Sequence, residues 1–522
     1  PALRAQGGMS NSHVRISVDG PWSRDSGFLA SVRLGFPGGL AKPGEASYLR
    51  GEAGDLLGKG GANFLGGELG FLVYGSWNGL DAAAGADTSD SLPTIPLRND
   101  FEWESLSMGS TWTRETGGGA LRVKAWAAGN RAHASWHAEL ERPATLAARR
   151  QDVGFSAEVE EGRWGGQTVA GFLLQGIHTG YRVAPGGGGS NNPDLDARTV
   201  LVTPYVQQQL QVAPAVMAEV AVSLPTEGGR TRISPRGRLS WTPTEALGFG
   251  GSIARVFQFA QSLRNSESVV VNVFPVDLFM GSDEPGIPVA RGDQGTLSVD
   301  FRPAPGTRLR AETYIRNSSR LLLVAPVDRG PFSTSGAAVG GGRGRGLSLE
   351  ASFRASRYGV VASYGWHHLR LRHQDTRFRP EWGAAHNFEG GVIAFPSTNS
   401  SVRLGFTAVG GRRTTAVAGL VEWESCNLLD GGCEFGGTPL LGDDPPGSTK
   451  LPPYFRLDLG LQKHWHHRLG GRDLLVSLFG TVTNLLGRAN LLTMATDPLT
   501  GERVGVQMRP LSPLVLGIDW RF

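Results

Sequence analysis

Residues 514–522, LVLGIDWRF, end the chain on a stretch in which apolar and polar residues alternate strictly. A β-strand places alternate side chains on opposite faces, so this stretch would carry one wholly apolar face and one charged face. Chain ends usually fray, so a terminal strand this regular needs a neighbouring strand to hold it. The apolar face holds Leu514, Leu516, Ile518, Trp520 and Phe522, and the other face holds Gly517, Asp519 and Arg521.

The same period of two recurs through most of the chain, for example in residues 297–316, 347–354 and 455–462. A water-soluble β-sandwich would also alternate. Here, however, the polar face is rich in Arg, Asp and Glu, and the apolar face often ends in Trp or Tyr. That combination is typical of a barrel with lipid outside and a polar interior.

The connections between these segments alternate in length. Short ones fall at 242–245, 303–306, 354–359, 396–400 and 466–471, and long ones at about 261–292, 318–344, 372–384, 411–452 and 487–510. Short periplasmic turns and long extracellular loops are the asymmetry of outer-membrane barrels. We therefore predict an all-β fold: one large transmembrane antiparallel barrel domain over residues 1–522, with about 22 strands. The last strand should close against the first, because an open edge in lipid leaves backbone groups unsatisfied.

The composition and the absence of known motifs disfavour several other classes of protein. The chain has 522 residues, of which 76 are Gly, and no run of 18 or more apolar residues predicts a transmembrane helix. The net charge of +4 is carried by scattered arginines, so a nucleic-acid partner is disfavoured. No GxSxG, HExxH or paired CxxC motif occurs, which predicts no enzyme activity and no cofactor. Cys426 and Cys433, in CNLLDGGC, are close enough in sequence for a local disulfide, which would indicate an oxidising compartment.

Several motifs, in this order and spacing, resemble TonB-dependent outer-membrane receptors. They are VRISVDGPWSRDSGFLASVRLGF (14–36), RISPRGRLSWTPTEALGFGGSIARVFQF (232–259), FRPEWGAAHNFEGGVIAF (378–395), LPPYFRLDLGLQ (451–462) and LFGTVTNLLGRANLL (478–492). The resemblance implies energised uptake of a scarce, bulky nutrient across the outer membrane of a Gram-negative-type bacterium. Ferric siderophore, cobalamin, glycan and peptide all stay open as ligands.

The resemblance also implies partners. It implies the TonB–ExbB–ExbD complex and outer-membrane lipid and lipopolysaccharide. The family's barrel assembly machinery would read the apolar face of residues 514–522. Members carry an N-terminal plug domain that has no counterpart in this chain, so we expect a plug outside it or on a separate polypeptide.

Two other classes remain as alternatives. A structural or scaffold barrel within a larger envelope complex would also lack a plug, and a soluble all-β enzyme such as a hydrolase would also show alternation. A plug-encoding segment favours the transporter, and partitioning into water without detergent favours the soluble enzyme.

Two histidine groups are candidate sites. His464 and His466 share the polar face of their strand beside a short turn, where a His-x-His pair can bind metal. A polar interfacial rim, with Trp465 in the aromatic girdle, explains them more simply, because no carboxylate or cysteine is next to them. His367, His368 and His373 lie towards a long connection and are candidates for ligand binding at the outer face. Arg255 falls on an apolar parity, which predicts a bulge or the headgroup boundary, because mid-bilayer placement would cost roughly 2–4 kcal/mol.

Overall fold

The computed structural model describes most of the chain. The described residues are 3–35, 48–84, 97–137, 144–163, 165–184, 194–263, 278–282, 286–324, 337–380, 383–414, 426–427, 432–433, 447–496, 503–508 and 513–522.

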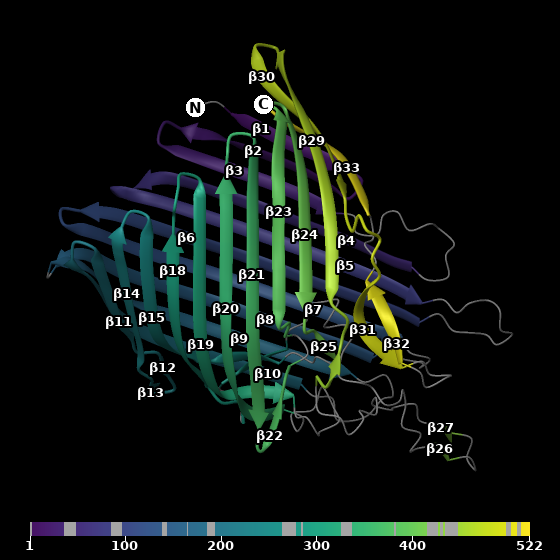
Figure 1. Cartoon of the computed structure of the whole chain (residues 1–522). Helices are drawn as coiled ribbons and strands as arrows, with labels where there is room; N and C mark the ends of the chain where they lie inside the picture. Colours follow the sequence, from purple (N-terminus) through teal and green to yellow (C-terminus); the bar gives the residue numbers. More distant parts are fainter. Residues whose placement is uncertain are drawn as a thin grey trace.

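Twenty-two antiparallel strands of the described residues form one closed barrel (Figure 1). Each strand pairs with the next around the wall, and β33 pairs with β1 to close the ring. The predicted fold class and strand number are confirmed. The barrel strands are β1 (Arg4–Ser10), β2 (His13–Ser23), β3 (Ser26–Gly35), β4 (Tyr48–Phe64), β5 (Gly67–Ala84), β6 (Leu97–Thr116), β7 (Gly119–His137), β8 (Ala144–Arg163), β9 (Gly166–Ala184), β10 (Asp194–Ala213), β11 (Val216–Ser223), β14 (Ser234–Thr244), β15 (Leu247–Gln258), β18 (Ala290–Phe301), β19 (Thr307–Val324), β20 (Ala337–Arg354), β21 (Tyr358–His373), β23 (His386–Ser397), β24 (Ser400–Gly410), β29 (Tyr454–Leu469), β30 (Arg472–Val482) and β33 (Leu514–Arg521).

The remaining described strands are short and lie in the connections between barrel strands. They are β12 (Thr226–Glu227), β13 (Arg230–Thr231), β16 (Ala260–Leu263), β17 (Leu278–Gly281), β22 (Thr376–Phe378), β25 (Arg413–Thr414), β26 (Cys426–Asn427), β27 (Gly432–Cys433), β28 (Thr449–Lys450), β31 (Asn490–Thr496) and β32 (Arg503–Met508). Within the described residues, no helix is long and apolar enough to cross a membrane.

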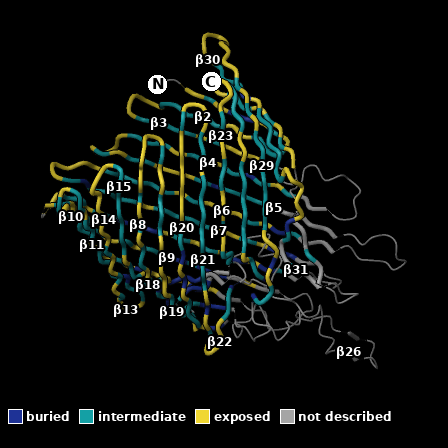
Figure 2. Tube along the Cα trace, in the orientation of Figure 1, coloured by how far each residue is buried: buried dark blue, intermediate teal, exposed yellow. Residues whose placement is uncertain are grey.

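The apolar parity of each strand faces outwards. Large hydrophobic side chains lie open around the wall, such as Ile253 at 70% exposure and Leu297 at 65%. In water this would be an unstable surface, but in a bilayer it is the surface that contacts acyl chains. Few residues are fully buried, and they gather towards one end of the barrel (Figure 2).

The two ends of the barrel differ in their connections. One end carries short turns such as 65–66, 245–246 and 470–471, and the other carries long connections such as 259–289 and 411–453. The first residues of β1 and the last of β33 lie at the short-turn end (Figure 1). The observed strands β19 and β20 extend further than the sequence predicted, so the connection between them shortens to 325–336.

The closing seam explains how the terminal strand is held. Gly7 lies opposite Trp520 and Gly8 opposite Asp519, and a side chain on either glycine would overlap its partner. Phe522 N–H donates a hydrogen bond to the Ala5 carbonyl (2.8 Å) at the end of the ladder. The regular pattern of residues 514–522 therefore serves a strand that is paired on both sides, by β1 and β30.

Candidate functional site: the lumen and its mouth

The inner wall of the barrel is polar and charged. Arg15 reaches Asp519 (2.9 Å) across the seam, and Arg33 reaches Asp55 (2.6 Å) two strands further on. The arginine side chains of these pairs are more than half exposed, so each pair stabilises the fold by less than about 1 kcal/mol. Their main effect is to make the lumen surface hydrophilic.

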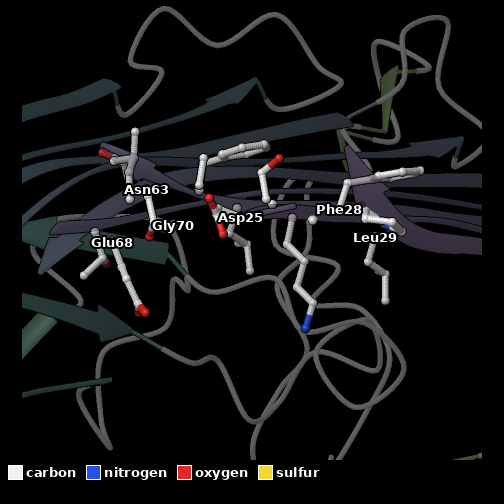
Figure 3. A pocket seen from close by; sticks show the side chains of 18 of the residues that line it. Asp25, Phe28, Leu29, Asn63, Glu68 and Gly70 are labelled. Atoms are coloured by element: carbon white, nitrogen blue, oxygen red, sulfur yellow. The ribbon is translucent and has the colours of Figure 1, made fainter. Parts of the chain in front are cut away.

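A recess of about 1260 Å³ lies against this wall near the short-turn end, over strands β2 to β7. Lys59, Glu68 and Lys124 line it together with Leu29 and Trp126. Figure 3 shows the recess from close by, with Leu29 and Glu68 labelled among its lining residues. Mixed charges beside an indole and a leucine suit a protein surface or an amphipathic solute.

At the other end, the short hairpin β16–β17 folds into the lumen and contacts β8, β9, β10 and β19. Phe259, Ala260 and Val289 pack there on the lumen-facing side chains of Ile177 and Leu201, and these five residues form a buried apolar cluster. This cluster accounts for part of the gathering of buried residues near the long connections (Figure 2).

Gln261 anchors this hairpin. Its amide nitrogen donates to the carbonyls of Pro288 (2.6 Å) and Arg320 (3.1 Å), and its carbonyl oxygen accepts from Leu322 N–H (2.8 Å). Arg320 has φ +58° at a β-bulge in β19, which turns its carbonyl out of the ladder with β20. The hairpin is thereby fixed to a wall strand by one buried side chain.

Two arginines lie at the rim of the long-connection end. Arg413 donates to the carbonyls of Gly447 (3.0 Å) and Ser448 (3.3 Å). Burial, followed by the charges of Arg413 and Arg370, lowers the pKa of the Arg379 guanidinium. Among the described residues, neither Arg379 nor Arg413 forms an ion pair with a carboxylate, so this part of the rim is positive.

The residues of the C-terminal motifs form a hydrogen-bonded clamp at the same end. Asp458 accepts from Asn484 N–H (2.9 Å), and Arg488 donates to the Pro453 carbonyl (3.1 Å). The buried Asn490 side chain makes two bonds to the backbone of Phe455, accepting from its N–H (2.9 Å) and donating to its carbonyl (2.8 Å). The motifs therefore tie β29 to the connection that follows β30, a role that the sequence did not reveal.

The candidate histidines do not converge on one site. His367 faces the lumen, where Nδ1 lies 3.1 Å from Tyr314 Oη, whereas His368 faces outwards and stacks on Trp366. His373 Nδ1 lies 3.2 Å from the Val339 carbonyl.

His464 and His466 do share the lumen face, with ring centroids 5.9 Å apart. Among the described residues, no group of three potential metal ligands is present. A ligand or metal role for these histidines therefore stays a prediction.

Arg255 faces outwards in regular register with Asp293. Its guanidinium bonds the Asp293 carboxylate (2.6 Å), which also binds Arg291 (2.6 Å). The ion pair towards the long-connection end of β15, rather than a bulge, accommodates this charge on the apolar parity.

The structure also places the predicted disulfide and the predicted assembly signal on strands. Cys426 and Cys433 are register partners in β26–β27, a Cα spacing that a disulfide can bridge, although the bond itself stays a prediction. The predicted assembly signal lies on the outer face of β33, except for Phe522, which follows the strand. Its recognition by an assembly machinery also stays a prediction.

Comparisons with known proteins agree with this architecture. A family model described as TonB dependent receptor-like, beta-barrel matches residues 34–485. No curated protein matches the sequence.

Solved structures match over the whole of this chain. The ferric yersiniabactin uptake receptor FyuA from Yersinia pestis matches at 12% identity and TM-score 0.65, with 80% of its chain covered. The ferric-catecholate import receptor Fiu from E. coli K12 matches at 9% identity and TM-score 0.64, with 81% covered. The copper transporter OprC matches at 11% identity and TM-score 0.63, with 80% covered. At these identities the likeness shows the fold alone.

Proposed function

We propose that this chain, which belongs to the TonB-dependent receptor-like β-barrel family, carries a bulky anionic solute such as a ferric siderophore. The family consists of outer-membrane nutrient-uptake receptors and not of enzymes, and it acts with TonB and a plug domain. The proposal adds the chemical class of the cargo and the partners of this particular chain.

The observation that carries the anionic cargo is the positive rim. A Cβ at Gly447 would meet the Arg379 carbonyl oxygen and lie 3.9 Å from Arg413 Cβ, so the two arginines are neighbours at the rim. After burial, the charge of Arg413 also contributes to the lowered pKa of Arg379. Two guanidinium groups held together, with no carboxylate partner in the part of the chain that the structure describes, would attract an anion. Bidentate hydrogen bonds to carboxylate or catecholate oxygens would orient it. The names of FyuA and Fiu concern ferric ligands, and that of OprC concerns copper, which supports a metal chelate as the class.

The lumen supports a plug as a partner. Residues 1–522 would form one barrel domain, and the recess over β2–β7 offers charged and apolar side chains to a folded plug. By family, the plug would be moved by TonB–ExbB–ExbD, the barrel would lie in the outer membrane of a Gram-negative-type bacterium, and the assembly machinery would insert it through β33.

Uptake measurements test the cargo. Cells that rely on this receptor should take up a negatively charged ferric siderophore, and R379Q/R413Q should reduce initial uptake at least tenfold at subsaturating ligand. R468Q, at an exposed short turn on the opposite end, is the matched control and should keep normal uptake. Equal uptake of neutral and anionic chelates would contradict the anionic cargo, and no uptake of any tested solute would favour the scaffold alternative.

A further inference from the structure

Five arginines gather on the outer face of the barrel, and no lumen function uses them. Arg343 and Arg345 lie on β20, Arg370 and Arg372 on β21, and Arg377 on β22. On β20 they share the outward parity of Leu347 and Phe353, and on β21 that of Tyr364 and Trp366. All five are exposed. We call these five residues the outer arginine patch.

The strand register sets these charges against one another. Arg343 is the register partner of Arg370, Arg345 that of His368, and Arg372 that of Arg377. Side chains directly opposite across an antiparallel pair are about 5 Å apart at Cβ, and like charges in that position are destabilising. Among the described residues, no ion pair joins any member of the patch to a carboxylate. The register therefore concentrates repulsion that a bound anion would relieve.

Several other outward arginines of this barrel are neutralised. Arg255 and Arg291 share Asp293, and Arg149 pairs with Asp196. Arg198 also approaches Asp196 (3.9 Å). The outer arginine patch thus differs from these arginines in both the number of its charges and the lack of an acidic partner within the described part of the chain.

The height of the patch places it at the edge of the bilayer. Tyr358 packs against Phe353 at the short-turn end of β20–β21, and Trp366 lies eight residues further along β21. Eight residues span about 26 Å of strand, and the tilt of barrel strands reduces this to a height of roughly 20 Å. An apolar band bordered by aromatic residues is about 25 Å tall in such barrels, so the patch begins where lipid headgroups begin.

We propose that the outer arginine patch binds a phosphorylated lipid of the outer leaflet. Guanidinium groups match phosphate oxygens with two parallel hydrogen bonds, and several arginines can hold more than one phosphate. The acyl chains of the same molecule would lie on Leu347, Leu349 and Trp366 directly below. Arg345 is already held over the Trp366 ring (5.7 Å), which aligns its guanidinium at the boundary. A lipid is favoured over a soluble anion because the apolar band begins directly below the charges, on the same face of β20 and β21.

Binding to the purified barrel in an uncharged detergent tests the proposal. The probes are a fluorescent lipid with two headgroup phosphates, the same lipid without phosphates, and inorganic pyrophosphate. Wild type should bind the phosphorylated lipid at least tenfold more tightly than either other probe. R343Q/R370Q/R372Q should weaken that affinity at least tenfold, and R149Q/R198Q, the matched outward control, should change it less than twofold.

A conservative variant separates binding from folding. R343K/R370K keeps the charges but loses the planar fork, so its affinity should fall between wild type and the glutamine variant while the barrel still folds. Each variant is first checked for the resistance of a folded barrel to unheated SDS. Equal affinity of wild type for the two lipids, tight binding of pyrophosphate, or unchanged affinity in R343K/R370K and the glutamine variant would each overturn the proposal. These assays do not involve uptake, so they stand apart from the proposed cargo.

Discussion

Gln261 should decide whether the hairpin β16–β17 stays inside the lumen. Its side chain is 4% exposed and makes three hydrogen bonds, to Pro288, Arg320 and Leu322. Gln261→Leu keeps a side chain of similar size but removes both polar ends. The variant then leaves the Leu322 N–H and two carbonyls without this partner.

The expected cost follows from those bonds. Each contributes about 1 kcal/mol net, so the anchorage weakens by about 3 kcal/mol, more if the groups stay buried and unsatisfied. Because every 1.4 kcal/mol is a factor of ten, opening of the hairpin should become about a hundredfold more frequent. The buried cluster around Phe259 should slow opening in the variant without preventing it.

Hydrogen exchange read by mass spectrometry measures this opening directly. Amide protection in peptides covering 260–263 and 278–281 should fall about a hundredfold in Q261L, while peptides of β4 and β5 keep theirs. Gln175→Leu is the control, because Gln175 also faces the lumen but makes one longer bond, to Asp152 (3.3 Å). Protection that changes less than threefold in Q261L, or equally in Q175L, would refute the role assigned to Gln261.

Two further predictions concern stability. N490A should lower the free energy of unfolding by about 2–4 kcal/mol, because it removes two part-buried hydrogen bonds to the Phe455 backbone. N387A, at an exposed amide, should change it by less than about 0.5 kcal/mol. Denaturant unfolding of the refolded barrel measures both, and equal midpoints would contradict the clamp. G7A places a methyl group where the Trp520 ring lies, so it should slow closure of the barrel in a refolding assay. G58A, where an added Cβ has no atom within 4 Å, should refold like wild type. Equal refolding rates of G7A and G58A would show that the ring moves aside freely.

The sequence predicted the wall of this protein well because the wall obeys a local rule. Lipid on one side and water on the other impose a period of two, so the outward position of Leu457 and the inward position of Asp458 follow from parity alone. The lengths of the connections distinguished the two ends of the barrel by another local rule. A hydrogen-bonded hairpin needs only about two residues, so short connections mark one end and long ones the other.

The sequence did not predict the contents of the mouth. Gln261 carries no pattern of its own, and its three bonds join segments that are 27 to 61 residues apart. The sequence also did not show which of the candidate histidines face the same side of the wall. His367 and His368 are neighbours in sequence, and neighbours on a strand necessarily face opposite sides of the wall. Their proximity in sequence therefore does not bring these two side chains together, and a ligand-binding role for either stays a prediction.

The parity of a residue shows which side of the wall its side chain faces, but not where along the strand the membrane ends. Charged residues on the outward parity supply this second piece of information. Arg255 and Arg345 lie on the apolar parity of their strands, so parity alone would place both in lipid. The bilayer tolerates such charges only near its edge, where their cost falls to about 0–1 kcal/mol. Each outward charge therefore marks where the hydrocarbon layer stops on its strand, and Trp366, two residues before His368, marks the same level from the aromatic side. At that level, Arg255 pairs with the Asp293 carboxylate on the neighbouring strand. Arg345 has no carboxylate partner among the described residues. The lipid itself is therefore the partner to test at β20–β21.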